Sequence, residues 1–343
     1  MRIIYRISLF LVITITIGLA YSHSDAFKAF IWMESDQLFQ VEKVRNCELV
    51  YTSASSNFSQ NEESDKRKLS QFVDDFYPGL AMEAFNIPAS HIGYHFKLLK
   101  LIPENSRVKT VICAINLRSF GADWRNSELE TTLNKQAVMY AQRPPLLNRF
   151  LLSLNAYDDK QANERADDRR DEWDQELLPY ENPKNSVNNW CQLEKWGDWR
   201  NPKRQLADQY IKQYAFVIDE TNSRIQNLDA LVTLAEKRDW NLVLSILPEN
   251  IEKADSLVGE DLTNLIFANS EWIKTRYSSH QNVSVLNIVN ILSSEHFTDK
   301  DFPTEHYDAK GRMIVASYVA FAIRKHHQEN FSNPIWATNL NFK

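Results

Sequence analysis

The stretch VKTVICAINL, residues 108–117, decides the fold class of this 343-residue chain. It is a continuous apolar run with several β-branched residues, which is typical of a central parallel strand buried on both faces. Shorter apolar runs occur at 49–52, 241–246 and 283–288. Segments with helical spacing separate these runs, and such alternation indicates βαβ units. The sequence therefore predicts a three-layer α/β/α domain in which these strands are neighbours in one mainly parallel sheet.

Helical spacing of apolar residues predicts four helices, at 66–76, 228–237, 260–277 and 309–325. The stretch 155–205 differs, because it is dense in charge and then places three tryptophans close together. We interpret it as an insertion, or a lid, made of a solvated helix followed by a tryptophan-anchored loop.

The N-terminus has the pattern of an export signal. Two arginines are followed by the apolar run 7–21, which is the arrangement of a charged region before a hydrophobic one. The run is shorter than the roughly 20 residues of a comfortable membrane span, so a cleaved signal and an uncleaved anchor both remain open. Basic residues on its N-terminal side favour an N-in orientation. We expect residues 1–24 to be the leader and residues 25–343 to be one extracytoplasmic domain, periplasmic or at the cell surface.

Composition excludes several classes of function. The net charge is −6, which disfavours binding to nucleic-acid phosphates. The chain has only 7 glycines and no glycine-rich phosphate loop. Its 3 cysteines lack CxxC spacing, and no pair of histidines stands in a metal-binding motif such as HExxH. The sequence therefore predicts no cofactor, no metal and no nucleic-acid partner.

The first predicted strand runs into a turn, SASSN at 53–57. A serine on a sharp turn after a parallel strand is well placed to act as a nucleophile, because the turn amides and a helix N-terminus can stabilise an oxyanion. Ser55 and Ser56 are both candidates. A turn that only caps the next helix is the alternative.

Two further polar groups follow predicted strands. Asn116 ends the central strand, where its amide is a candidate oxyanion donor. The loop before the last helix offers His306 as general base and Asp301 as the acceptor that fixes its tautomer. Glu305 is the rival orienter, but adjacent side chains usually diverge. The alternative is a plain helix start with Asp308 as the N-cap.

Their order along the chain resembles that of the SGNH (GDSL-like) hydrolase superfamily. Residues 53–55 look like its first block, residues 114–116 like its asparagine block, and Asp301 to His306 like its DxxH block. Ala89 or Ser90 stands where the family usually has an oxyanion-hole glycine, and the Asp301–His306 spacing is five instead of three. The resemblance implies a Ser–His–Asp triad of Ser55, His306 and Asp301, with Asn116 and Ala89 at the oxyanion.

The leader and this domain together are similar in layout to the DltD family of membrane-anchored acyl-transfer proteins. That resemblance implies acyl transfer to, or ester hydrolysis on, an envelope glycan or polymer, beside a membrane-bound O-acyltransferase. The alternatives are a secreted carbohydrate or lipid esterase and a non-catalytic envelope binding protein. All enzymatic versions predict that Ser55 Oγ lies within about 4 Å of a His306 ring nitrogen, with Asn116 facing the same pocket.

Overall fold

One parallel sheet organises the chain. The computed structural model describes residues 2–24, 41–59, 63–140, 145–157 and 160–339. Within these residues the sheet has five strands in the order β2-β1-β3-β4-β5, and every neighbouring pair is parallel. The strands are β1 (Leu49–Ser53), β2 (Met82–Asn86), β3 (Thr110–Ile115), β4 (Asn241–Ile246) and β5 (Val283–Asn287). The predicted α/β class and its parallel sheet are confirmed.

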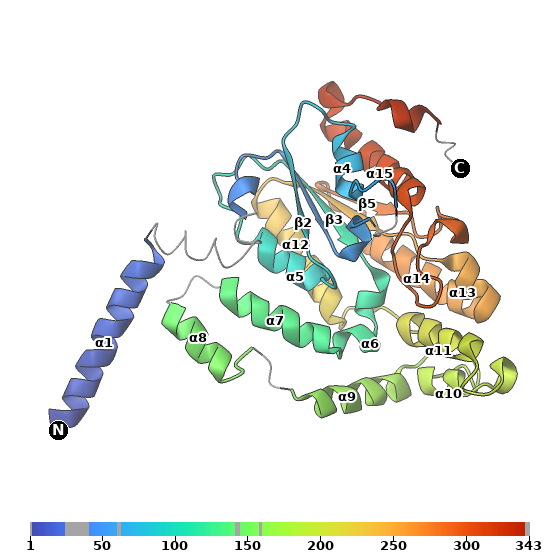
Figure 1. Ribbon diagram of the computed structural model, residues 1–343, viewed down its shortest axis with the longest axis horizontal. Coiled ribbons are helices and arrows are strands. Elements are labelled where there is room, and N and C mark those ends of the chain that lie inside the picture. The colour runs from blue at the N-terminus through green and yellow to red at the C-terminus, as the bar shows by residue number, and fades with distance from the viewer. Residues whose placement is uncertain (1, 25–40, 60–62, 141–144, 158–159, 340–343) are drawn as a thin grey trace.

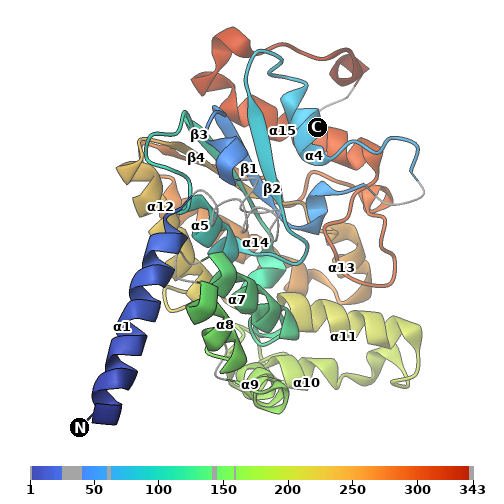
Figure 2. The ribbon, with the colours of Figure 1, turned by 60° about the vertical axis from the view of Figure 1, so that its left-hand side comes forward.

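Helices cover both faces of the sheet (Figures 1 and 2). One face packs against α4 (Leu69–Asp74) and α15 (Ala309–Ile323). The other face packs against α5 (Ile92–Leu99), α12 (Ser223–Lys237) and α14 (Glu260–Tyr277). The sheet therefore lies between two helical layers.

Other helices lie at the ends of these layers or outside them. The set comprises α1 (Arg2–Ser22), α6 (Ala122–Arg125), α7 (Glu128–Tyr140), α8 (Pro145–Ser153), α9 (Ala162–Gln175), α10 (Val187–Cys191), α11 (Pro202–Tyr214) and α13 (Ile251–Leu257).

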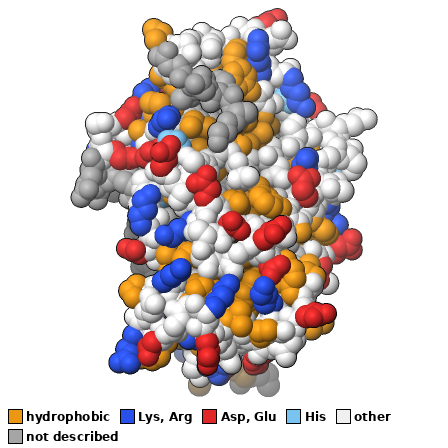
Figure 3. Space-filling model, turned by 90° about the vertical axis from the view of Figure 1, so that its right-hand side faces the viewer, with side chains coloured by type: hydrophobic (Ala, Val, Ile, Leu, Met, Phe, Trp, Pro, Cys, Tyr) orange, Lys and Arg blue, Asp and Glu red, His pale blue; other side chains and the backbone are white. Residues whose placement is uncertain are grey.

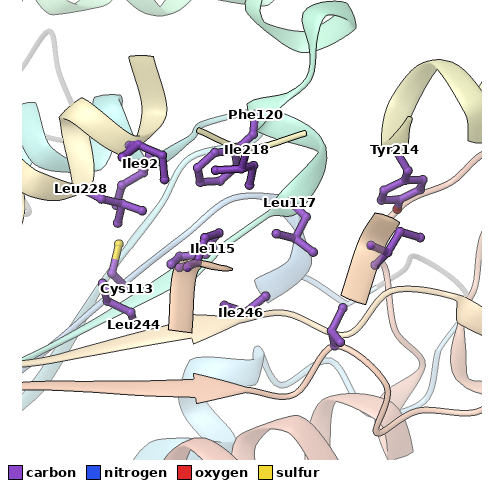
Figure 4. Packing of buried hydrophobic residues seen from close by; sticks show 14 of the residues in the cluster. Ile92, Cys113, Ile115, Leu117, Phe120, Tyr214, Ile218, Leu228, Leu244 and Ile246 are labelled. Atoms are coloured by element: carbon purple, nitrogen blue, oxygen red, sulfur yellow. The ribbon is translucent and has the colours of Figure 1, made fainter. Parts of the chain in front are cut away.

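The central strand β3 is apolar at every position because both of its faces are buried. Successive side chains of a strand point to opposite faces. Val111, Cys113 and Ile115 enter the core beneath α5 and α12, as the close-up in Figure 4 shows for the last two. Ile112 and Ala114 enter the core beneath α4 and α15. Because both faces are covered, no position of β3 faces water, and all six of its residues are buried.

The strand order reverses between β1 and β3. The chain moves outward from β1 to β2 and then returns to place β3 on the other side of β1, with Leu49 opposite Thr110 and Thr52 opposite Cys113. At such a reversal the connections leave in opposite directions, which opens a crevice at the carboxyl ends of the strands. The candidate residues after β1 and β3 are therefore brought to one place by the topology.

The N-terminal helix α1 is apolar and stands apart from the sheet (Figure 1). Its span Ile3–Tyr21 has a mean hydropathy of 2.2 and is 0% buried, so it is long and apolar enough to cross a membrane. A signal sequence near an N-terminus meets the same description. The helix is therefore compatible with either a signal or an anchor.

The charged stretch 155–205 forms α9, α10 and the start of α11. Trp190 and Trp196 are buried, and Trp196 Nε1 donates to Leu257 O at 2.8 Å, whereas Trp199 is 68% exposed. Two of the three tryptophans therefore anchor this part of the chain. Its status as an insertion in a single domain stays a prediction.

Candidate active site

Ser55 lies in the turn that follows β1. A short 3₁₀ turn, Ser55–Asn57, starts there, and Asn57 fixes it against α4. The side-chain oxygen of Asn57 accepts a hydrogen bond from Ser70 N at 2.7 Å, and its amide donates to Ser70 Oγ at 3.0 Å. The same amide also contacts Asn86 at the end of β2. The turn is therefore held between two elements of the core.

His306 lies in the loop that precedes α15. An antiparallel bridge between Phe297 and Tyr307 closes this loop, and Thr298 N donates to His306 O at 2.9 Å. The buried rings of Phe297 and Tyr307 pack edge to face with centroids 5.5 Å apart. Asp308 caps α15 by accepting a hydrogen bond from the first turn, as the sequence predicted. The two ends of the loop are therefore held together by the bridge and the packed rings.

The two segments meet in a continuous series of hydrogen bonds. Ser55 Oγ lies 2.9 Å from His306 Nε2, and His306 Nδ1 lies 2.8 Å from Asp299 Oδ2. Thr304 Oγ1 donates to the same carboxylate oxygen at 2.6 Å. The His306 side chain is 23% exposed, so the series is open to solvent on one side. This geometry can move a proton from the serine to an imidazole whose tautomer is fixed.

The acid in this series is Asp299, and the prediction of Asp301 was wrong. The bridge between Phe297 and Tyr307 aligns two antiparallel segments and so brings Asp299 back to the His306 ring. Asp301 lies two residues farther into the loop and is exposed. Sequence reasoning chose the nearer of two aspartates, and the alternation TDKD gave no way to choose between them.

Glu305 does not orient His306 and has another partner. Arg118 donates two hydrogen bonds to its carboxylate, from Nε to Oε1 and from Nη2 to Oε2, each 2.6 Å long. Asn116 Nδ2 donates to Glu305 Oε2 at 2.9 Å. The Arg118 and Glu305 side chains are only 5% and 3% exposed. This ion pair therefore ties the His306 loop to the carboxyl end of β3, a role for Arg118 that the sequence analysis missed.

A second carboxyl group lies beside this ion pair. Glu249 follows β4, is buried, and accepts a hydrogen bond from the Tyr214 hydroxyl. Burial, followed by the charge of Glu305, raises the pKa of Glu249 well above its usual 4.5.

Asn116 is hydrogen-bonded to the buried pair of Arg118 and Glu305. One of its two amide protons is donated to Glu305, which leaves the second for another acceptor. Within the described residues, Asn116 Oδ1 is buried without a partner. Ser56 is also buried, and its Oγ has no partner among the described residues. The structure thus brings Ser55, and not Ser56, to His306.

Ala89 lies in the turn after β2. Its φ is 57°, a left-handed conformation that favours glycine over residues with a side chain. Ser90 N donates to Ile87 O at 3.1 Å within this turn, and Ile87 N donates to Ser53 O at 3.1 Å. The turn therefore adjoins the end of β1, and its conformation gives a physical reason for a glycine at this position.

Two buried histidines lie behind this turn. His95 Nε2 and Ser90 Oγ are 2.7 Å apart, and His91 Nε2 lies 3.1 Å from Glu130 Oε1. Burial lowers the pKa of His95 to about 3 and that of His91 to about 4. Both rings are therefore neutral in the folded chain at neutral pH.

These histidines predict acid sensitivity. The unfolded chain binds a proton at His95 near pH 6.5, whereas the folded chain binds it only near pH 3. Stability is therefore complete above pH 6.5 and falls as the pH drops toward 3, by on the order of 3 to 5 kcal/mol from this residue. His95→Gln should flatten the dependence of unfolding free energy on pH, measured by urea denaturation. His280, whose side chain is 37% exposed, provides the control, since His280→Gln should change the slope much less than His95→Gln does; equal slopes for all three proteins would contradict the prediction.

The buried ion pair predicts a large stability effect. Arg118→Met leaves the Glu305 carboxylate buried without its cation, which should lower the free energy of unfolding by about 3 to 5 kcal/mol. Adding Glu305→Gln should recover most of that loss in urea denaturation, because the unpaired charge is then gone. Lys274→Met breaks an exposed pair and should cost less than about 1 kcal/mol. An Arg118→Met variant as stable as the parent would contradict this prediction.

No group of three or more His, Cys, Asp or Glu side chains able to hold a metal is found among the described residues. A polar hollow of about 280 Å³ lies next to the site, between α4 and β2. Its lining includes Ser70 and Asn86, the two partners of Asn57, but it does not include Ser55 or His306. The hydrogen-bonded series therefore defines the candidate site better than the hollow does.

Comparisons with known proteins add little to this geometry. No family model matches the chain, and no curated protein matches it. Eight chains of solved structures match it. One, from Streptococcus pneumonia, is provisionally described as a platelet activating factor; it is 11% identical, the match covers 88% of this chain and 99% of that chain, and the TM-score is 0.39. A likeness this distant does not carry that protein's activity to this chain.

Proposed function

We propose that this chain is an extracytoplasmic serine enzyme of the SGNH type that transfers or hydrolyses acyl esters. One observation carries the proposal, namely the hydrogen-bonded series from Ser55 through His306 to Asp299. Its support comes from the position of all three groups beyond the carboxyl ends of the parallel strands, where ligands of such sheets bind. Asp299 replaces Asp301 as the orienting acid in this proposal.

The first half of the reaction forms an acyl-enzyme. His306 Nε2 takes the hydroxyl proton of Ser55 while Ser55 Oγ attacks the ester carbonyl carbon. The bond between that carbon and the leaving oxygen then breaks, and His306 returns the proton to the leaving alcohol. Asp299 holds Nδ1–H throughout and stabilises the imidazolium that forms in between.

The second half returns the enzyme to its starting state. A glycan or polymer hydroxyl, or water, gives its proton to His306 and attacks the acyl carbon. The bond from that carbon to Ser55 Oγ breaks, and the serine takes the proton back. Transfer and hydrolysis differ only in the acceptor, so the same residues serve both.

Donors for the oxyanion come from three places. The backbone amides of Ser55 and Ala89 and the second amide proton of Asn116 are the candidates. The contact from Asn116 to Glu305 supports this role, because it holds the amide in one orientation before substrate arrives. The adjoining turn that carries Ala89 supports the same assignment.

The apolar helix α1 supports the extracytoplasmic part of the proposal. Either a cleaved signal or an anchor delivers the remainder of the chain across the membrane. An envelope glycan or polymer is then the accessible acceptor. A membrane-bound O-acyltransferase that supplies the acyl group is the partner we propose for the anchored form.

Fluorophosphonate labelling tests the proposal directly. The probe forms a covalent phosphonyl ester with an activated serine, so the purified chain should be labelled, and peptide mapping should place the label on Ser55. Label on Ser56 would mean that the nucleophile is misassigned. A chain that binds acylated glycans but takes up no probe would instead be a non-catalytic binding protein.

A further inference from the structure

Helix α8 carries an apolar stripe that no other part of the described chain covers. Leu147, Phe150 and Leu154 recur at helical spacing and are 41%, 56% and 60% exposed. Leu154 follows the last residue of α8, but its N–H still donates to Phe150 O at 3.1 Å, so it continues the same turn. Large exposed apolar side chains gathered on one face of a helix mark a contact surface.

Helix α8 has a long apolar helix as its neighbour. Helix α1 contacts α8. In both ribbon views α8 lies beside α1, nearer the C-terminal half of α1 than its N-terminal end (Figures 1 and 2). No residue of the apolar window of α1 is buried. The stripe therefore belongs to a helix that adjoins the one described helix long enough to enter a bilayer.

From this juxtaposition we infer that α8 lies on the surface of the lipid bilayer that α1 enters, with Leu147, Phe150 and Leu154 inserted at the boundary between headgroups and acyl chains. Short amphipathic helices bind membrane interfaces in this way, with the apolar face buried some 5–10 Å deep. An N-in orientation of α1 places its C-terminal half in the outer leaflet, on the side where α8 lies. The inference does not depend on the serine chemistry.

Charge elsewhere on the molecule agrees with this orientation. Helix α9 follows α8 along the chain and reads ANERADDRRDEWDQ, so it belongs in water. On the visible part of the face turned away from α1, acidic and basic side chains are interspersed (Figure 3). The face turned away from α1 is therefore suited to water, as the proposed orientation requires.

Spin labelling of the full-length chain in lipid nanodiscs tests the inference. The nanodiscs are made of phosphatidylethanolamine and phosphatidylglycerol, and a nitroxide is attached to Phe150→Cys. Oxygen partitions into lipid and a nickel chelate stays in water, so power saturation with each relaxing agent reports depth. The ratio of oxygen to nickel accessibility at position 150 should be several-fold higher than at Asp171→Cys on α9. Phe10→Cys in α1 gives the value for a bilayer-embedded site.

Two controls make the result decisive. The native cysteines are buried, and the parent chain measures their background labelling. Photoactivatable acyl chains applied to the unmodified protein should crosslink to the peptide that contains α8 and not to α9. A ratio at position 150 equal to that at 171, low access to both agents, or no crosslink on α8 would each overturn the inference. Low access to both agents would point to a protein partner on the stripe.

Discussion

His306→Ala is expected to lower the rate of fluorophosphonate labelling at Ser55 by roughly 10³-fold or more. The serine hydroxyl is a weak nucleophile at neutral pH, and the only described acceptor near its proton is His306 Nε2 at 2.9 Å. Without that acceptor the hydroxyl must lose its proton to water. The rate is measured under pseudo-first-order conditions on folded protein, with the far-ultraviolet circular dichroism of the variant compared with that of the parent.

The control for this variant is a histidine away from the site. His280→Ala, at a partly exposed position where the ring pairs with Glu236, should label at the parent rate. Ser55→Ala should remove the label altogether, whereas Ser56→Ala should retain it. If His306→Ala labels normally, the acyl-transfer mechanism should be abandoned in favour of the binding-protein alternative.

Asp299→Asn is expected to lower the labelling rate by a factor on the order of 10² to 10⁴ and to keep the fold, by analogy with triad aspartates in general. The carboxylate accepts the Nδ1 proton of His306 at 2.8 Å and so keeps Nε2 free to accept from serine. An amide can present its N–H to Nδ1, which would fix the opposite tautomer and leave Nε2 protonated.

Asp301 provides the matched comparison. It is the same residue type in the same loop, but it is exposed. Asp301→Asn should therefore label at nearly the parent rate. Slow labelling by Asp301→Asn with normal labelling by Asp299→Asn would show that the two acids are assigned the wrong way round.

The fold could be predicted from the sequence because its signal is local. A strand buried on both faces needs apolar residues at every position, and VKTVICAINL has that pattern within ten residues. Helix boundaries were less predictable. The helix predicted at 228–237 begins at Ser223, because Asn222 caps it through a bond to Arg224 N at 3.0 Å, and hydrophobic spacing does not report such a cap.

The site was predictable only in part, because its contacts are not local. Ser55 and His306 follow recognisable elements, so their meeting could be expected from parallel topology alone. The choice of Asp299 depends on a bridge between Phe297 and Tyr307, which no periodicity reveals. Arg118 was missed because its partner is 187 residues away and buried charges leave no pattern in sequence.

The distance along the chain between serine and base has a consequence for biosynthesis. Ser55 and His306 are 251 residues apart, so their contact cannot form until all five strands and the loop before α15 have been synthesised. At synthesis rates of about 5–20 residues per second, the serine emerges from the ribosome roughly 10–50 s before the histidine. Throughout that interval the nascent chain contains the proposed nucleophile but not its proposed base. If the proposed mechanism holds, a polypeptide interrupted before the loop of His306 should not react with the fluorophosphonate probe.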